Sequence, residues 1–328
     1  EGVDLSGEAT GYLWLPFFLQ LSADPDLAPS DLNLFLLYPR WVKWFKKCFS
    51  QDDKCDQKDP FYIAERTRTR RPDATWSPPS CLPLRFYTRL RFHIIQNLAR
   101  EKCYFSTFLF LKASSYRRLK PFSDLFGATS RLVLTQQPTL DELAELPVED
   151  LASQLYELSG HHLPDPMDNA RKLKRVARES FPLDETLALP VQRILDLTLD
   201  HIRFLEAQVK QVDGWIATEL EAYPVIAQLA TIPGIGPVFS SGIGAELGSV
   251  KRFLQAPKWD RKRKRFRRRN LRDAEDAVAK IAGLWWPRAG SGDFEAQDRH
   301  MAKTGNRYLR YYLVQAANLM RQHIPEYA

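Results

Sequence analysis

Cysteine is scarce in this sequence of 328 residues, and long apolar runs are missing from it. The four cysteines, at positions 48, 55, 81 and 103, show no CxxC spacing, which argues against a zinc site and against a disulfide framework. No apolar stretch reaches the roughly 18 residues that a membrane span needs, and we expect no signal peptide. These absences predict reduced thiols in a cytoplasmic protein that has no membrane partner.

Positive charge is abundant but unevenly placed. The net charge is +7, yet residues 251–272 hold twelve Lys or Arg and one acid, Asp260, so the remainder of the chain is mildly acidic. Cations this dense repel one another unless a polyanion compensates them, so the run predicts contact with nucleic acid, with a solvated loop as the alternative. The cations expected at this contact are Arg261, Lys262, Arg263, Lys264, Arg265, Arg267, Arg268 and Arg269.

Two long stretches have the periodicity of helices. In residues 187–223 apolar side chains recur at steps of three and four, which predicts one helix roughly 54 Å long with a coiled-coil seam. This seam is expected to pack either on an earlier helix, such as residues 168–180, or on a second copy of the chain. Residues 84–103 predict an amphipathic helix whose cationic side faces nucleic acid or water. Its arginines are Arg85, Arg89, Arg91 and Arg100.

Glycines mark two candidate sites in the last third of the chain. Gly234 and Gly236 lie between helical segments and predict a helix-hairpin-helix whose backbone N–H groups meet a phosphate. A tightly packed corner would use the same two glycines. Ser291 is flanked by Gly290 and Gly292, so it sits on flexible backbone that another molecule can approach closely. A plain glycine-rich surface loop is the alternative there.

Three parts of the sequence resemble a known family. The C-terminal segments AGLWWP, SGDFEA and KTGNRYLRYYLVQAAN are similar to the C-terminal domain of the insertion sequence family 110 transposases. These are DNA recombinases related to the pilin-gene inversion recombinase. Residues 8–12, EATGY, resemble that family's EATGxY, and residues 54–64, KCDQKDPFYIA, resemble its KxDxxDAxxIA. The matching segments together span most of the chain.

The resemblance implies an α/β part followed by a mostly α part. It implies a partial RuvC-like (ribonuclease H-like) domain in residues 1–115, long coiled-coil helices in residues 116–230, and a C-terminal helical domain with the helix-hairpin-helix in residues 231–328. In the first domain Glu8 would end a strand, with a helix after it. The apolar residues 34–38 predict a second, buried strand.

The resemblance also implies a reaction and its partners. Ser291 would attack DNA and form a phosphoserine intermediate, while Glu8, Asp56 and Asp59 would hold Mg²⁺. The implied partners are DNA, a structured guide RNA and a second protomer bound through the coiled coil, in a bacterial or archaeal cytoplasm near the nucleoid. The basic turn that opens the last helix is expected to add nucleic-acid contacts through Lys303, Asn306 and Arg307.

Two departures from the family pattern leave alternatives open. The family's first metal-binding aspartate lies in a strand far ahead of the glutamate, whereas the similar Asp4 lies only four residues before Glu8. Pro60 replaces an alanine, and proline favours the first helical position, which makes Asp59 a candidate helix cap. The alternative to an active recombinase is therefore a truncated, inactive remnant that only binds nucleic acid. A coiled-coil scaffold whose basic segment is a solubilising loop is a third hypothesis.

Overall fold

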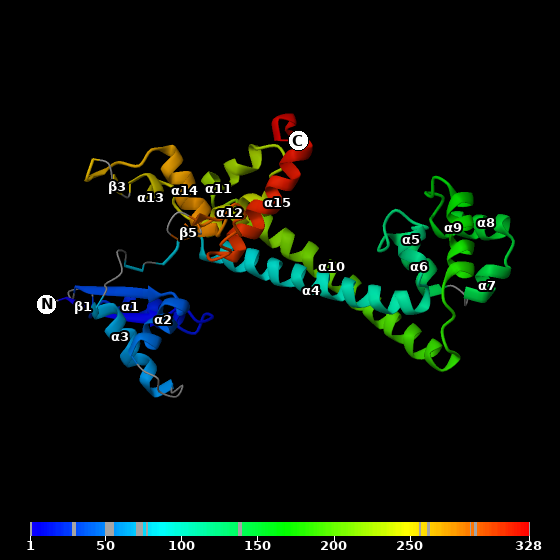
Figure 1. The fold of residues 1–328 in the computed structure, drawn as a ribbon, viewed down its shortest axis with the longest axis horizontal. Helices are drawn as coiled ribbons and strands as arrows, with labels where there is room; N and C mark the ends of the chain where they lie inside the picture. Colours follow the sequence, from blue (N-terminus) through cyan, green and yellow to red (C-terminus); the bar gives the residue numbers. More distant parts are fainter. Residues whose placement is uncertain are drawn as a thin grey trace. The chain divides into compact units, whose positions relative to one another are not determined.

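The computed structural model describes residues 2–27, 31–49, 56–69, 75–76, 78–136, 140–255, 257–260, 263–288, 290–291 and 294–327. The chain divides into two compact units, Glu1–Leu82 and Pro83–Ala328. The first unit contains a small α/β arrangement and the second is mostly helical, which confirms the expected combination of classes (Figure 1). The first compact unit ends at Leu82, whereas the resemblance implied a first domain that reaches residue 115.

The first unit is built on a pair of parallel strands. Strands β1 (Val3–Glu8) and β2 (Leu32–Leu37) are paired in register from Val3↔Leu32 to Glu8↔Leu37, and helix α1 (Leu15–Ala23) lies between them in the chain. The predicted strand at residues 34–38 and the position of Glu8 at a strand end are thereby confirmed. Gly7 permits the close packing of α1 on β1, because a Cβ there would lie 3.1 Å from the buried ring of Phe18.

Three further helical segments complete this unit. They are α2 (Pro39–Phe49), the short 3₁₀ helix η1 (Asp56–Lys58) and α3 (Asp59–Thr69), which packs against both β1 and α2. Trp76 closes the core, since its backbone N–H donates to the carbonyl of Leu34 and its ring contacts Phe18 edge to face at 5.3 Å.

The second unit contains two long antiparallel helices, α4 (Leu82–Lys112) and α10 (Glu185–Leu220) (Figure 1). Helix α10 begins after Asp184, whose side chain accepts from the backbone of Thr186, and its 36 residues confirm the predicted helix. The contacts between the two helices fix their direction, since residue numbers fall along α4 as they rise along α10. These contacts are Lys112–Gln192, Glu101–His201, Lys102–Glu206, Arg91–Asp213 and Tyr87–Trp215.

Five short helices form a core at the end of the pair where α4 finishes and α10 starts. They are α5 (Tyr116–Leu119), α6 (Ala128–Gln136), α7 (Leu140–Glu145), α8 (Val148–Leu158) and α9 (Pro166–Glu179). Leu151 and Leu155 of α8 are fully buried in one cluster with Phe105 of α4 and Ile202 of α10. Residues 168–180, which we expected to pack on the seam of α10, lie in α9. The helix that runs along α10 is instead α4.

The opposite end of the pair carries the C-terminal helices. They are α11 (Pro224–Ala227), η2 (Gln228–Thr231), α12 (Pro237–Leu247), α13 (Lys251–Gln255), α14 (Leu271–Ala282), α15 (Arg307–His323) and η3 (Pro325–Tyr327). Tyr312 of α15 is fully buried and donates a 2.7 Å hydrogen bond to the carbonyl of Thr88. Its ring fits only because position 242 is glycine, where a Cβ would lie 2.4 Å from it. None of the helices in the described residues is both long and apolar enough to cross a membrane.

Candidate nucleic-acid interface

The basic run folds in part as a β-hairpin, which we did not expect from the sequence. Strands β3 (Lys258–Asp260) and β4 (Arg265–Arg267) are antiparallel, with Lys258 opposite Arg267, Trp259 opposite Phe266 and Asp260 opposite Arg265. Two of the cations expected at the contact, at positions 261 and 262, lie outside the described residues. Side chains alternate between the two faces of a strand, so the middle pair faces away from the outer two.

One face of the hairpin is fixed to the start of α14 by Asp273. The carboxylate of Asp273 accepts hydrogen bonds of 2.5 Å from Lys258 and of 2.5 and 3.2 Å from Arg267. It also accepts from the backbone N–H of Asn270, which caps α14 in return. These donors, Arg267 first, hold the pKa of the Asp273 carboxyl well below its usual range. Arg267 is therefore engaged within the protein, which revises its expected role as a phosphate contact.

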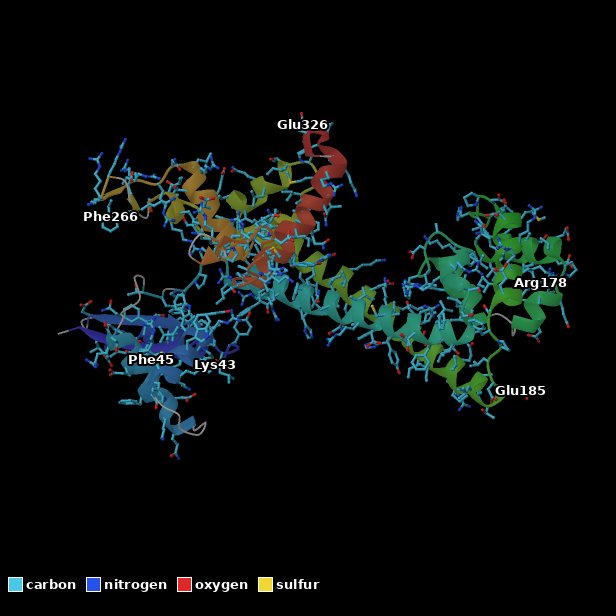
Figure 2. The ribbon with its side chains drawn as sticks, viewed as in Figure 1. Lys43, Phe45, Arg178, Glu185, Phe266 and Glu326 are labelled. Atoms are coloured by element: carbon cyan, nitrogen blue, oxygen red, sulfur yellow. The ribbon has the colours of Figure 1, made fainter. Side chains whose placement is uncertain are left out.

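The other face of the hairpin presents aromatic rings. Trp259 and Phe266 contact each other edge to face, with centroids 5.0 Å apart and ring planes at 69°. They are 49% and 66% exposed, and Figure 2 shows Phe266 on the outside of the second unit. Arg263 and Lys264 lie in the turn, are exposed, and belong to the cations that the sequence predicted. The hairpin thus combines exposed positive charge with an exposed aromatic pair.

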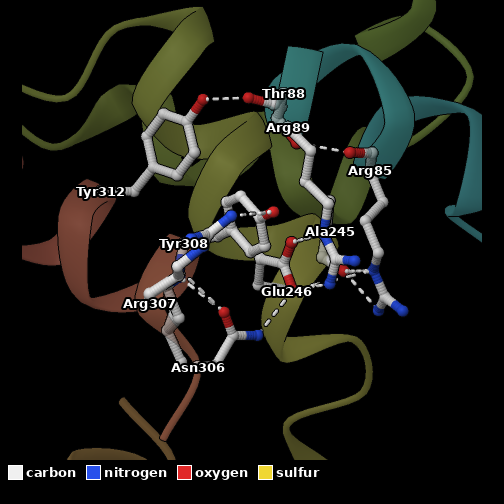
Figure 3. Close-up of polar contacts among 10 residues, drawn as sticks. Arg85, Thr88, Arg89, Ala245, Glu246, Asn306, Arg307, Tyr308 and Tyr312 are labelled. Carbon is white, nitrogen blue, oxygen red and sulfur yellow. Dashed lines mark hydrogen bonds and ion pairs between the residues drawn. The ribbon is translucent and has the colours of Figure 1, made fainter. Parts of the chain in front are cut away.

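Three of the four arginines named on α4 are engaged within the protein and do not face nucleic acid or water as expected, whereas Arg100 is exposed. Arg89 forms a bidentate pair with the buried carboxylate of Glu246, at 2.7 and 2.9 Å, and Arg85 donates two hydrogen bonds to the carbonyl of Ala245 (Figure 3). Arg91 pairs with Asp213 of α10. Arg85 and Arg89 thus join α4 to α12, where the buried Glu246 carboxylate is stable only when it is paired, and Arg91 joins α4 to α10.

Asn306 has a structural role in the same network. Its amide nitrogen donates a 2.6 Å hydrogen bond to Glu246, and its side-chain oxygen caps α15 by accepting from the backbone of Tyr308 and Leu309 (Figure 3). Lys303 is exposed with a φ of 51°, and its backbone N–H donates to Gly283. Of the three predicted contacts in this basic turn, Asn306 is therefore engaged by the protein itself.

Arg307 lies beside a small cavity between α4 and α15. The cavity has a volume of about 340 Å³, and Arg307 stands over the rings of Phe92 and Tyr308 at 5.7 and 4.9 Å. Its lining residues are Phe92, His93, Gln96, Arg100, Arg307 and Tyr308. No carboxylate occurs among these six described residues, so the cavity is suited to an anion or to the flat ring of a base.

The two glycines of the predicted helix-hairpin-helix differ in their surroundings. Gly234 has a φ of 86°, and a Cβ there would lie 3.0 and 3.1 Å from the backbone of Met320 and Leu319 in α15. Its lack of a side chain is thus explained by tight packing. Gly236 directly precedes α12, and a Cβ there would meet nothing within 4 Å. Of the pair, Gly236 is the one whose backbone a ligand could approach.

The candidate nucleophile lies in a loop that is closed at its base. Ser291 belongs to β5 (Gly290–Ser291), which is antiparallel to β6 (Phe294–Glu295), and its side chain lies outside the described residues. Backbone hydrogen bonds from Ala302 to Trp285 and from Asn306 to Ile281 hold the two ends of the loop together. The last of these brings position 305 so close to Ile281 that a Cβ would lie 2.3 Å from its carbonyl oxygen, which only glycine avoids.

The candidate metal ligands lie in the first unit. Glu8 is half-buried and accepts a 2.7 Å hydrogen bond from Thr10, while Asp59 pairs with Lys46 of α2. The capping prediction placed Asp59 just before a helix, but it is the first residue of α3. Asp4 lies four residues before Glu8 on one strand, so their Cα atoms are about 13 Å apart.

Asp56, another predicted metal ligand, is described only in its backbone. Its backbone belongs to η1 and its side chain lies outside the described residues. Among the residues that the structure does describe, no three His, Cys, Asp or Glu side chains are grouped as metal ligands. Carboxylate oxygens are nevertheless the donors that Mg²⁺ prefers, so Glu8 and Asp59 fit the predicted ion by chemistry.

Comparison with known proteins adds no relative. No protein-family model matches the chain, and no curated protein matches it.

Proposed function

We propose that this chain binds nucleic acid through its second unit and cuts and rejoins DNA as a metal-dependent serine recombinase of the transposase kind. The observation that carries the binding step is the β3–β4 hairpin, where exposed Arg263 and Lys264 stand at the tip of a structure clamped by Asp273. Clustered exposed cations bind the phosphate backbone and release its counterions. The cutting step rests on the resemblance of the segments around Glu8, Asp56 and Ser291.

In this proposal Ser291 is the nucleophile. Attack by its hydroxyl oxygen on a DNA phosphorus releases the neighbouring sugar oxygen and leaves a phosphoserine bond, which preserves the energy for rejoining. Glu8, Asp56 and Asp59 would hold Mg²⁺, which neutralises charge at the phosphate when it is bound. Binding of the guide RNA that the resemblance implies would draw on the same exposed cations.

The experiment that tests the reaction is a search for the covalent adduct. The full chain is incubated with labelled DNA in Mg²⁺ or Mn²⁺, and adducts are detected after denaturing electrophoresis. Ser291→Ala should abolish the adduct while DNA affinity stays nearly constant, because one hydroxyl adds little to a phosphate-dominated interface. Asp56→Asn should also abolish it. Adducts that persist in Ser291→Ala would refute the assignment of the nucleophile.

Nucleic-acid binding without catalysis is the second candidate, and the Lys46–Asp59 ion pair favours it. The Lys46 ammonium contacts the carboxylate that would otherwise bind a cation, and both side chains are about one-third exposed or less. A lysine in this position can replace a metal ion as the counter-charge. A chain that binds DNA tightly and never forms an adduct would support this second function.

We also propose that the chain forms a homo-oligomer through the outward side of the α4–α10 pair. The inward seam of α10 is already covered by α4, so a second copy has to use other side chains. Tyr104, Leu197 and Phe204 are 51%, 75% and 60% exposed and line a cavity of about 600 Å³. Exposed aromatic and aliphatic groups grouped in this way are typical of a protein interface.

A further inference from the structure

The two faces of the β3–β4 hairpin serve different purposes. Lys258 and Arg267 turn toward α14 and hold the hairpin in place through Asp273. Trp259 and Phe266 form the next cross-strand pair, turn to the opposite side of the hairpin and remain about half exposed or more. A hairpin of two three-residue strands would be marginal in isolation, so the Asp273 clamp keeps the aromatic face presented in one orientation.

We propose that the Trp259–Phe266 face is a stacking platform for unpaired bases of single-stranded DNA. The inference rests on the proposed function and adds to it the chemical group that this site recognises. DNA is the chosen partner because it is the substrate of the proposed function, and bases that are unpaired beside a strand break can stack on an exposed ring. The aromatic face then receives the exposed bases, and the hairpin turn receives the phosphates on either side of them.

The ring geometry suits this role. The planes of Trp259 and Phe266 are inclined by 69°, so the two rings do not cover each other's faces and at least one face stays open to a ligand. Every base has a flat apolar face, so stacking on an aromatic side chain is favourable and tolerant of sequence. Duplex DNA cannot offer this contact, because its bases are already stacked on one another.

The charges around the rings complete the platform. Arg263 and Lys264 are exposed and lie two to three residues from Phe266, within about 10 Å along the chain. A nucleotide stacked on the ring therefore has cations within reach of its own phosphates. Asp260 is the acid of this hairpin, and it is used locally, since Oδ1 accepts from the backbone of Arg263 and Oδ2 lies 3.9 Å from Arg267. A docking protein with an apolar face would not need this surround of positive charge.

The test uses the full chain and a single-stranded oligodeoxynucleotide that carries the fluorescent base 2-aminopurine, which is quenched when it stacks. The test variant is Trp259→Leu with Phe266→Leu, which keeps apolar bulk and removes both rings. Its matched control is Trp44→Leu with Phe181→Leu, two aromatic residues of similar exposure, 54% and 74%, elsewhere in the chain. The same series is run with duplex DNA and with a single-stranded oligoribonucleotide.

We expect the wild type and the control to quench the probe, and the test variant to lose the quenching together with roughly tenfold in single-strand affinity. The slope of log affinity against log salt should stay unchanged in the test variant, because no phosphate contact is removed. Arg263→Ala with Lys264→Ala should instead flatten that slope by roughly 1 to 1.5 units. Duplex affinity should hardly respond to loss of the rings.

Several results would overturn the platform. Equal quenching and affinity in the test variant would show that the rings do not touch the bases, while the proposed function would survive. If the protein quenches the RNA probe but not the DNA probe, the ligand of the aromatic face is RNA and the assignment to single-stranded DNA is wrong. A change of oligomeric state in the test variant, seen by sedimentation, would show that the face binds a second copy. A wild type that binds no nucleic acid at all would remove the proposed function and this inference together.

Discussion

Arg267 and Asp273 are joined by two hydrogen bonds, one of 2.5 Å from Nη1 to Oδ2 and one of 3.2 Å from Nη2 to Oδ1. This pair links the second strand of the hairpin to the capping box of α14. The basic run therefore contains two kinds of cation. Arg267 stabilises the fold by pairing with Asp273, whereas its neighbour Arg268 is exposed.

Substitution of these two neighbours should therefore have opposite effects. Arg267→Ala should lower the Tm by a few degrees and change the salt slope of DNA binding little, because the residue holds Asp273 and not a phosphate. Arg268→Ala should leave the Tm unchanged and flatten the slope by about 0.7 to 0.9 units. Calorimetry and a salt titration measure the two effects, and the reverse pattern would contradict the division of roles.

The low pKa of Asp273 predicts a particular dependence of stability on pH. Because the folded carboxyl has a pKa below the ordinary value of an aspartate, the unfolded state binds the proton more readily than the folded state. The stabilisation is thus complete above the unfolded pKa and is lost as the pH falls through the lower folded value. The Tm difference between wild type and Asp273→Asn should be constant from about pH 7 to pH 5 and shrink below pH 4. A difference that grows on acidification would contradict this sign.

The two hairpin glycines should respond differently to alanine. Gly234→Ala should lower the Tm clearly, because its φ of 86° and the nearby backbone of Met320 both oppose a side chain. Gly236→Ala should leave the Tm nearly unchanged, since its Cβ would enter open space. If the N-terminus of α12 meets a phosphate, this second variant should nevertheless weaken DNA binding. Equal melting temperatures for both variants would argue against the packing described for Gly234.

Lys46 provides a test of the metal prediction. Lys46→Met removes the ammonium that contacts Asp59, so Mg²⁺ should bind several-fold more tightly if this carboxylate is a ligand. Mn²⁺ titration followed by electron paramagnetic resonance measures the affinity. Arg40→Met, which removes a cation from the same helix, serves as the control. A fall in Tm with no change in metal affinity would leave Asp59 with a structural role alone.

Self-association should depend on the outward side of α10. Leu197→Glu with Phe204→Glu should shift the protein towards monomer, because it places charge on the most exposed apolar residues of this face. Leu205 and Val212 are 4% and 2% exposed against α4, so glutamate there would unfold the pair and report nothing about assembly. Sedimentation at several concentrations measures the shift. A wild type that is monomeric at every concentration would refute the proposed oligomer.

The sequence predicted the elements whose signal is local. The helix at residues 187–223 follows from a period of three and four, and the strand at residues 34–38 follows from a short apolar run before a proline. The pairing of α4 with α10 was not predicted, because the residues that contact each other are far apart in the sequence. Arg89 meets Glu246 at a separation of 157 residues, and Arg91 meets Asp213 at a separation of 122. Without these partners, a row of arginines on a helix is typical of a charged surface.

The hairpin was missed for a different reason. Strands of three residues inside a dense run of cations show no alternation of apolar and polar residues long enough to predict a sheet. A signal was present in the symmetry of Trp259 and Phe266, each flanked by charged residues on both sides. The arrangement of Ser291 and the acids relative to one another depends on how the two units meet, which local patterns do not encode.

The distance in sequence between the partners of α4 has a consequence for how the chain is made. The core that contains Phe105 and Ile202 is complete once about the first two-thirds of the chain has been synthesised, since its buried members lie between those residues. The first half of α4 must then wait, because Arg85 needs Ala245 and Thr88 needs Tyr312, 160 and 224 residues later. Arg85 and Arg89 lack their partners until residues 245 and 246 have been made, so a chain that stops before them would be partly folded, cationic and prone to aggregate.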